Sequence, residues 1–275
     1  MAEDAEEQPV FETSTGPVRV ITAASLFDGH DAAINVMRRL IQASGAEVIH
    51  LGHDRSAKDV VDCAIQEDAH AVALTSYQGG HVEYFTYIRQ LLDGAGCEHV
   101  RIFGGGGGTI TPPEIRELHQ AGISKIYSPD DGRTMGLFGM IHHLMGIAQE
   151  VDLTSDARMK SLDGPVTPEE MAKVGLLLTL SESADETTFK QTLEVCRSST
   201  NDVPVIGFTG TGGAGKSSLL DELMLRIQRD NPGKKVCLLC VDPTRKRTGG
   251  ALLGDRIRMN SLSNNDLYMR SLASR

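Results

Sequence analysis

Short apolar runs alternate with stretches of helical periodicity over the first half of the chain. The apolar runs, which predict strands, lie at 18–24, 46–51, 71–76, 98–103 and 124–128. Residues that recur every three or four positions predict helices at 31–43, 57–68, 80–93, 113–120 and 132–148. This repeat is typical of a parallel α/β sheet with helices on both faces. We therefore expect a five-stranded, doubly wound, flavodoxin-like or Rossmann-like domain over residues 18–150.

The pattern changes twice in the second half of the chain. Residues 151–202 begin with a stretch rich in Thr, Ser, Asp and Gly and continue as two short helical segments, so we expect a helical linker there. A second α/β unit is expected over residues 203–275. It has predicted strands at 203–209 and 235–241, on either side of a predicted helix at 217–229.

A glycine-rich loop joins the first strand and the helix of this second unit. Strand, glycine loop and helix are the context that a phosphate-binding P-loop requires, because the loop turns backbone N–H groups toward a polyphosphate at the positive end of the helix. The residues expected at the nucleotide are Gly210, Gly212, Gly213, Ala214, Gly215, Lys216, Ser217 and Ser218. Lys216 would stabilise phosphate charge, the one catalytic role predicted in this chain. The Ser217 hydroxyl would bind Mg²⁺.

Composition and charge narrow the class of protein. The 275 residues suit two domains, and the net charge of −10 argues against nucleic-acid or anionic-membrane binding. Part of this charge lies in an acidic run at 3–7, within an expected flexible tail over residues 1–17. The sequence shows no secretory leader and no apolar stretch long enough to span a bilayer, so we expect a cytoplasmic protein.

The five cysteines are scattered, and their odd number predicts reduced thiols. Cys237 and Cys240 have C-x-x-C spacing, but they lie within an apolar predicted strand. Side chains three apart on a strand point to opposite faces. Core packing is therefore favoured over metal or redox chemistry.

Polar residues follow the first predicted strand, at the sheet edge where doubly wound domains bind ligands. Asp28 and His30 form an Asp-x-His pair. A carboxylate bonded to one imidazole nitrogen can orient the other toward a metal. The same pair can also cap a helix start, and the residues alone leave both interpretations open.

Two further strand ends converge on the same edge. Five glycines, 104–108, follow the fourth predicted strand, and without side chains they would admit a bulky ligand to the backbone. The same run could instead be a flexible loop or a phosphate-binding nest. Thr75 and Ser76 follow the third strand and add hydroxyls.

These motifs together resemble the cobalamin-binding domain of adenosylcobalamin-dependent mutases, whose pattern is D-x-H-x-x-G, S-x-L and G-G. The resemblance implies that His30 is the axial cobalt ligand, that Asp28 orients it, and that the glycine strand borders a pocket for the cofactor's nucleotide tail. The cofactor-binding residues it implies are Asp28, Gly29, His30, Ala33, Thr75, Ser76, Gly104, Gly105 and Gly106. The chain departs from the pattern at Ala33, where the family has glycine, and at Thr75-x-Tyr77.

Acids near the P-loop form a second set of landmarks. Asp242 ends the second strand of this unit and Asp255 lies in Gly254-Asp255-Arg256-x-Arg258-Met259. Taken alone, they read equally well as Mg²⁺ ligands or as turn and surface acids. With the P-loop they resemble the G-proteins that act as chaperones of cobalamin mutases. That resemblance implies Mg²⁺ binding by Ser217, Asp242 and Asp255, a nucleotide contact by Arg258, and GTP as the ligand.

The order of the two parts resembles the fused isobutyryl-CoA mutase family. The resemblance implies an isomerase that interconverts isobutyryl-CoA and n-butyryl-CoA, with a GTPase domain that supervises loading and protection of adenosylcobalamin. It also implies a homodimer and an acyl-CoA-binding barrel that this sequence lacks. We therefore expect an N-terminal portion, incomplete by itself for either activity.

Two alternative functions remain at this point. A corrinoid methyl carrier would usually place a helical cap before the domain, where 17 residues stand here. A cofactor-free, receiver-like regulator fused to a P-loop switch would need an acid after the third strand, where the chain has Thr75-Ser76-Tyr77.

Overall fold

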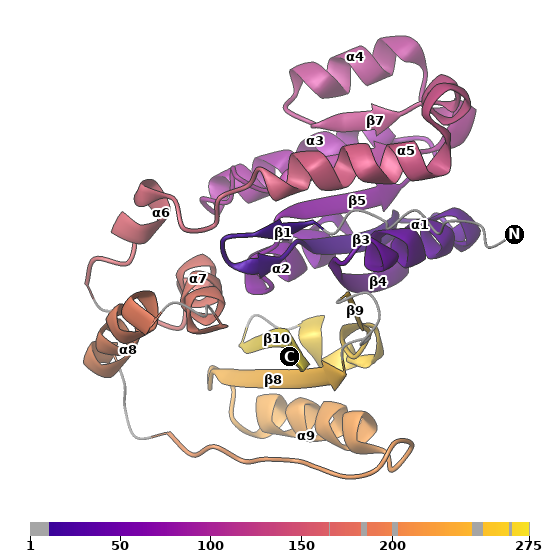
Figure 1. Ribbon diagram of the computed structural model, residues 1–275. Helices are drawn as coiled ribbons and strands as arrows, with labels where there is room; N and C mark the ends of the chain where they lie inside the picture. The colour runs from indigo at the N-terminus through magenta and orange to yellow at the C-terminus, as the bar shows by residue number, and fades with distance from the viewer. Residues whose placement is uncertain are drawn as a thin grey trace, which may run out of the picture.

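A computed structural model describes residues 11–164, 166–182, 186–199, 203–243, 250–263 and 266–274. Its main feature is a six-stranded parallel sheet with the order β7-β6-β5-β3-β4-β9 (Figure 1). The strands are β3 (Arg19–Ser25), β4 (Glu47–Arg55), β5 (Ala71–Thr75), β6 (Arg101–Gly105), β7 (Lys125–Tyr127) and β9 (Ala251–Leu253). The first five have the flavodoxin-like order, with the topological switch point between β3 and β5.

Helices cover both faces of this sheet, which confirms the predicted doubly wound α/β fold. One face packs against α1 (Asp31–Ala43) and α5 (Pro129–Gln149). The other packs against α2 (Ala57–Gln66), α3 (His81–Gly94) and α4 (Pro112–Gln120). Reciprocal capping bonds between Ser56 and Asp59 fix the start of α2. The central strands are buried on both faces, as their continuous apolar runs predict.

The sheet has one strand more than the sequence predicts, because a segment of the second unit joins it. In β9, Ala251, Leu252 and Leu253 pair with Glu47, Val48 and Ile49 of β4. Three residues are too few for a periodic signal, so the pattern along the chain could not reveal this strand. The two units are consequently built around one shared sheet.

The rest of the second unit is a small parallel pair of strands packed on one helix. β8 (Val236–Pro243) pairs with β10 (Leu267–Ser274), and α9 (Lys216–Asp230) packs against them. The second unit also contains the 3₁₀ turns η2 (Arg256–Arg258) and η3 (Asn260–Ser263), whereas η1 (Gly107–Thr109) follows β6 in the first domain. Before this unit come α6 (Asp156–Lys160), α7 (Met171–Glu182) and α8 (Glu186–Ser199).

Two local expectations are wrong. Residues 203–209 form no strand and are exposed, with Val205 at 93% exposure. A strand requires a neighbouring strand, and in the described second unit β8 and β10 pair with each other. Within the expected flexible tail, β1 (Glu12–Thr13) and β2 (Gly16–Pro17) form a small antiparallel pair.

Cys240 is buried and Cys237 exposed, so their side chains do lie on opposite faces of β8, and core packing applies to Cys240 alone. No helix in the described residues is long and apolar enough to cross a membrane. The acidic run at 3–7 lies outside the described residues.

His70, just before β5, is expected to make the fold sensitive to mild acid. It is 2% exposed and its Nδ1 accepts the Arg19 backbone N–H at 3.0 Å, which requires a neutral ring. Burial, with the Arg19 charge, lowers the pKa of His70 to about 3. Its pKa in the unfolded chain is about 6.5. Between these values the unfolded state binds the extra proton, so the stability falls as the pH falls, by at most about 1.4 kcal/mol per pH unit.

Urea unfolding of the chain at pH 7, 6 and 5, beside His70→Gln, checks this expectation. The substitution should reduce the loss of unfolding free energy between pH 6.5 and 5 by up to about 2 kcal/mol. An identical pH dependence in both proteins would contradict a neutral buried His70.

Candidate cofactor and nucleotide sites

Asp28 and His30 form a preorganised pair at the carboxyl end of β3. Asp28 is fully buried, and its Oδ1 accepts the His30 backbone N–H at 2.9 Å and lies 2.8 Å from His30 Nδ1. Its Oδ2 accepts the Tyr77 backbone N–H at 2.6 Å. Burial raises the pKa of Asp28, but the hydrogen bonds from Tyr77 and His30 outweigh it and the net pKa is lowered.

The ionised carboxylate fixes the histidine tautomer. Because Asp28 can only accept, His30 Nδ1 must carry the proton, and Nε2 keeps the lone pair that a metal needs. The His30 side chain is 70% exposed at the sheet edge. His30, the residue before α1, makes no side-chain cap bond, and the Asp28 carboxylate instead bonds the backbone and ring of His30.

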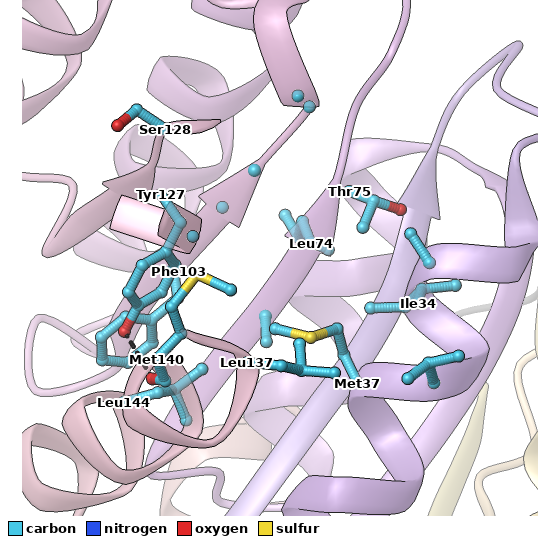
Figure 2. A pocket seen from close by; sticks show the side chains of 18 of the residues that line it. Ile34, Met37, Leu74, Thr75, Phe103, Tyr127, Ser128, Leu137, Met140 and Leu144 are labelled. Carbon is cyan, nitrogen blue, oxygen red and sulfur yellow. Dashed lines mark hydrogen bonds between the residues drawn. The ribbon is translucent and has the colours of Figure 1, made fainter. Parts of the chain in front are cut away.

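An apolar cavity of about 350 Å³ lies between α1, α5 and the ends of β5 and β6 (Figure 2). Tyr77, whose ring contacts that of His30, is one of its lining residues. Of the predicted residues, the cavity is lined by Ala33, Thr75, Gly104, Gly105 and Gly106. Thr75 Oγ1 is buried and has no hydrogen-bond partner in the described part of the chain. A buried hydroxyl is costly without a partner, and a ligand would satisfy this one only if Thr75 turned its oxygen toward the cavity.

Ser76 is not among the lining residues, contrary to expectation. Its hydroxyl bonds to Ser25 at 2.9 Å and its N–H to the Gly105 carbonyl at 2.9 Å. It therefore ties β3, β5 and β6 together. Successive side chains on an extended segment alternate in direction, which is why Thr75 and Ser76 cannot both face the cavity.

Sequence reasoning missed the apolar lining. It comprises Ile34, Met37, Phe103, Tyr127, Leu137, Met140 and Leu144, among others. The apolar positions on the inward faces of α1 and α5 were the available signal for this lining. In the sequence, however, they cannot be distinguished from residues that simply pack in the core. The break in α5 at Gly136, where φ is 63°, was not predicted, and the next residue, Leu137, faces the cavity (Figure 2).

The glycine run has a packing role besides leaving room for a ligand. A Cβ on Gly104 would overlap the Phe85 ring, and one on Gly106 would collide with the Ser76 carbonyl oxygen. The protein's own packing therefore requires glycine at both positions.

The P-loop lies exposed before α9, with left-handed φ values of 78° at Gly213 and 84° at Gly215. Lys216 Nζ donates to the carbonyls of Gly210 and Thr211 at 2.9 and 3.0 Å. Gly212, Ala214 and Ser218 are exposed along the same turn. The loop and the helix start are thus both present, although the strand expected before them is not.

Ser217 and Asp255 come together, 38 residues apart in the sequence. The Ser217 hydroxyl donates to Asp255 Oδ1 at 3.1 Å. This separation suits two adjacent ligands of an octahedral Mg²⁺ with bonds of about 2.1 Å. Burial and the charge of Asp255 raise the pKa of Asp242, so a cation would relieve both acids. Arg258 is largely exposed, with Nη1 3.8 Å from Asp255 Oδ1.

No group of three or more His, Cys, Asp or Glu side chains in the described residues could hold a metal by itself. A cation at Ser217 and Asp255 would therefore need further ligands from a nucleotide or water.

Comparisons with known proteins agree with a cobalamin-binding part and a GTPase part. Residues 18–130 match a family described as B12 binding domain, and residues 174–275 match one described as methylmalonyl Co-A mutase-associated GTPase MeaB. The fused isobutyryl-CoA mutase of Geobacillus kaustophilus is 51% identical over 94% of this chain and 24% of its own length. That of Nocardia farcinica is 49% identical over 100% of the chain and 25% of its own length. The chain belongs to the fused isobutyryl-CoA mutase family.

A third relative is the 2-hydroxyisobutanoyl-CoA mutase small subunit of Aquincola tertiaricarbonis. It is 34% identical over 42% of this chain and 82% of its own length. The chain spans about a quarter of the length of the fused isobutyryl-CoA mutases that it matches. Further domains or subunits of such proteins therefore lie outside it.

Proposed function

We propose that this chain is the cofactor-binding and nucleotide-binding portion of a fused isobutyryl-CoA mutase, with adenosylcobalamin held by His30. The observation that carries the proposal is the ionised Asp28 bonded to His30, at the sheet edge where Ala33, Thr75 and the glycine strand line an apolar cavity. This arrangement supports His30 Nε2 as the cobalt ligand and the cavity as the place of the nucleotide tail. It also distinguishes the chain from a cofactor-free regulator.

When bound, adenosylcobalamin supplies the radical chemistry of the rearrangement. The chain's own residues bind and orient. Asp28 keeps the proton on His30 Nδ1. The side chains of α1 and α5 would exclude water from the tail, and Gly105 and Thr75 would border it. The mutase relatives favour this reaction over corrinoid methyl transfer.

In the second unit, the P-loop residues from Gly210 to Ser217 would bind the phosphates of GTP, with Mg²⁺ at Ser217, Asp255 and Asp242. Arg258 would complete the nucleotide contact. GTP binding and hydrolysis would then control the loading and protection of the cofactor, which is the chaperone role of this domain.

We infer the remaining roles from the family. The acyl-CoA substrate, isobutyryl-CoA or n-butyryl-CoA, would bind to a barrel domain outside this chain, and the whole protein would form a homodimer. Five free cysteines fit a reducing compartment, so we place the protein in the cytoplasm. The division into residues 18–150, 151–202 and 203–275 likewise stays a prediction.

Electron paramagnetic resonance of the Co(II) cofactor on ¹⁵N-histidine-labelled protein tests the proposal. A nitrogen from His30 should give two hyperfine lines on labelling in place of three, because ¹⁵N has spin one-half. His30→Ala should abolish the change. His53→Ala, at an exposed position near the end of β4, is the matched control and should retain it. A nitrogen hyperfine splitting that is unchanged by ¹⁵N labelling of the wild-type chain would refute His30 ligation.

A further inference from the structure

We propose that Asp54 positions the loop that carries His30, and that Ile257 makes this position depend on the nucleotide at Ser217. The proposal rests on the two binding roles proposed above and concerns the connection between them.

Asp54 holds the backbone immediately before the cobalt-ligand pair. Its Oδ1 accepts the Phe27 backbone N–H at 2.7 Å, and the Gln78 side-chain amide donates to the Phe27 carbonyl. Phe27 and Asp54 both have left-handed φ values, 63° and 58°, which are costly for such side chains. Because Asp28 follows Phe27 directly, the Asp54 bond controls the direction in which the Asp28 carboxylate reaches His30.

The strand that carries Asp54 is in contact with the second unit. Gly52 of β4 has a φ of 85°, at an irregularity where the pairing with β3 shifts register. A Cβ placed on Gly52 would lie 2.7 Å from Ile257 Cδ1. Ile257 therefore rests on the Gly52 backbone, two residues before Asp54.

Ile257 belongs to η2, which is anchored at one residue and attached to the nucleotide site at another. Arg256 is buried, and its Nη1 donates to Glu67 and to the Met269 carbonyl, both at 3.1 Å. Asp255, immediately before η2, accepts the Ser217 hydroxyl. Since Arg256 is held, a displacement of Asp255 must rotate η2 and move Ile257 against Gly52.

The shared sheet makes this connection short. Asp255 follows β9, Asp54 lies near the end of β4 and Asp28 follows β3. These three strands are adjacent in the sheet. Mg²⁺–nucleotide at Ser217 and Asp255 would thus shift the Phe27 loop and change the affinity of His30 for a corrinoid. By linkage, a corrinoid on His30 would change the nucleotide affinity by the same factor.

Phenylalanine-selective ¹⁵N NMR of the whole chain tests the proposal, because the seven Phe amides give a simple spectrum. Phe27→Leu assigns the Phe27 signal. Asp54→Ala should speed amide exchange at Phe27 about tenfold, as expected for loss of one charge-assisted hydrogen bond. Asp54→Ala should also lower the fraction of Co(II) with a histidine nitrogen, without changing nucleotide affinity by more than about twofold.

The second arm adds the magnesium complex of a non-hydrolysable GTP analogue. The Phe27 signal should shift in the wild-type chain, about half as far in Ile257→Val, and not at all in Ile257→Ala. Leu225→Ala on α9, whose exposure of 40% matches the 42% of Ile257, should behave as the wild type. An equal shift in Ile257→Ala, or no shift in a wild-type chain saturated with nucleotide, would overturn the connection.

Separate measurements distinguish this failure from failure of the proposed function. Fluorescent-nucleotide titration reports binding at the P-loop, and the ¹⁵N-histidine spectrum reports His30 ligation. Absence of either would refute the proposed function and the connection together. If both are present with an unresponsive Phe27, the connection alone is refuted.

Discussion

Ala33→Phe is expected to weaken cobalamin binding by about 100-fold while leaving cobinamide, which lacks the nucleotide tail, within about twofold. Ala33 lies on the first turn of α1 and lines the cavity assigned to the tail. A phenyl ring there would occupy part of the 350 Å³ space. The lost burial of apolar tail surface, of about 100 Å² at roughly 25 cal/mol per Å², corresponds to the expected change.

The control for this prediction is Ala32→Phe, because Ala32 lies on the same turn but is exposed. It should leave both affinities unchanged. Absorbance titrations of the wild-type chain and the two variants, each with cobalamin and with cobinamide, measure the effect. Equal weakening of cobalamin and cobinamide by Ala33→Phe would show that the ring disturbs His30 rather than the tail, and no weakening would place the tail elsewhere.

Sequence periodicity was sufficient for the strands and helices of the first domain. The central strands β3 and β5 are largely apolar runs, and α1 and α2 each have an apolar stripe. The long helix α5 is rich in apolar residues but, broken at Gly136, has no single stripe. The Asp28–His30 pair could also be predicted from the sequence, because both residues lie in one short loop and their bond needs no distant partner.

Features that depend on distant partners were not predictable in the same way. Residues 203–209 have a strand's apolar pattern but no paired strand in the described structure, while Ala251 to Leu253 have almost no pattern and pair with β4. The contact between Ile257 and Gly52 likewise arises only once β9 joins the sheet.

Glu67→Gln is expected to cause the largest loss of stability, about 3–5 kcal/mol, because it leaves a buried arginine without its counter-charge. Glu67 is fully buried after α2 and accepts Arg256 Nη1 at 3.1 Å. It also accepts the Ser271 backbone N–H and hydroxyl, at 3.0 to 3.1 Å. These bonds fasten η2 and β10 of the second unit to the first domain.

Urea unfolding and limited proteolysis measure this effect. Glu98→Gln, an exposed acid, is the control and should change the unfolding free energy by less than about 0.5 kcal/mol. In Glu67→Gln, cleavage between the two units should precede unfolding of the first domain, because most of the core of α2, α3 and α4 on the sheet comes from the first domain, with Ala251 and Leu253 of β9 as the exceptions.

A double-variant cycle separates the lost ion pair from general damage. Arg256→Met removes the charge that Glu67 compensates, so Glu67→Gln combined with Arg256→Met should be less destabilising than the sum of the single changes, by about 1–3 kcal/mol. Strict additivity would mean that the pair contributes no mutual stabilisation. In that case Glu67 would act through Ser271, and Arg256 would anchor η2 through Gln66 and the Met269 carbonyl instead.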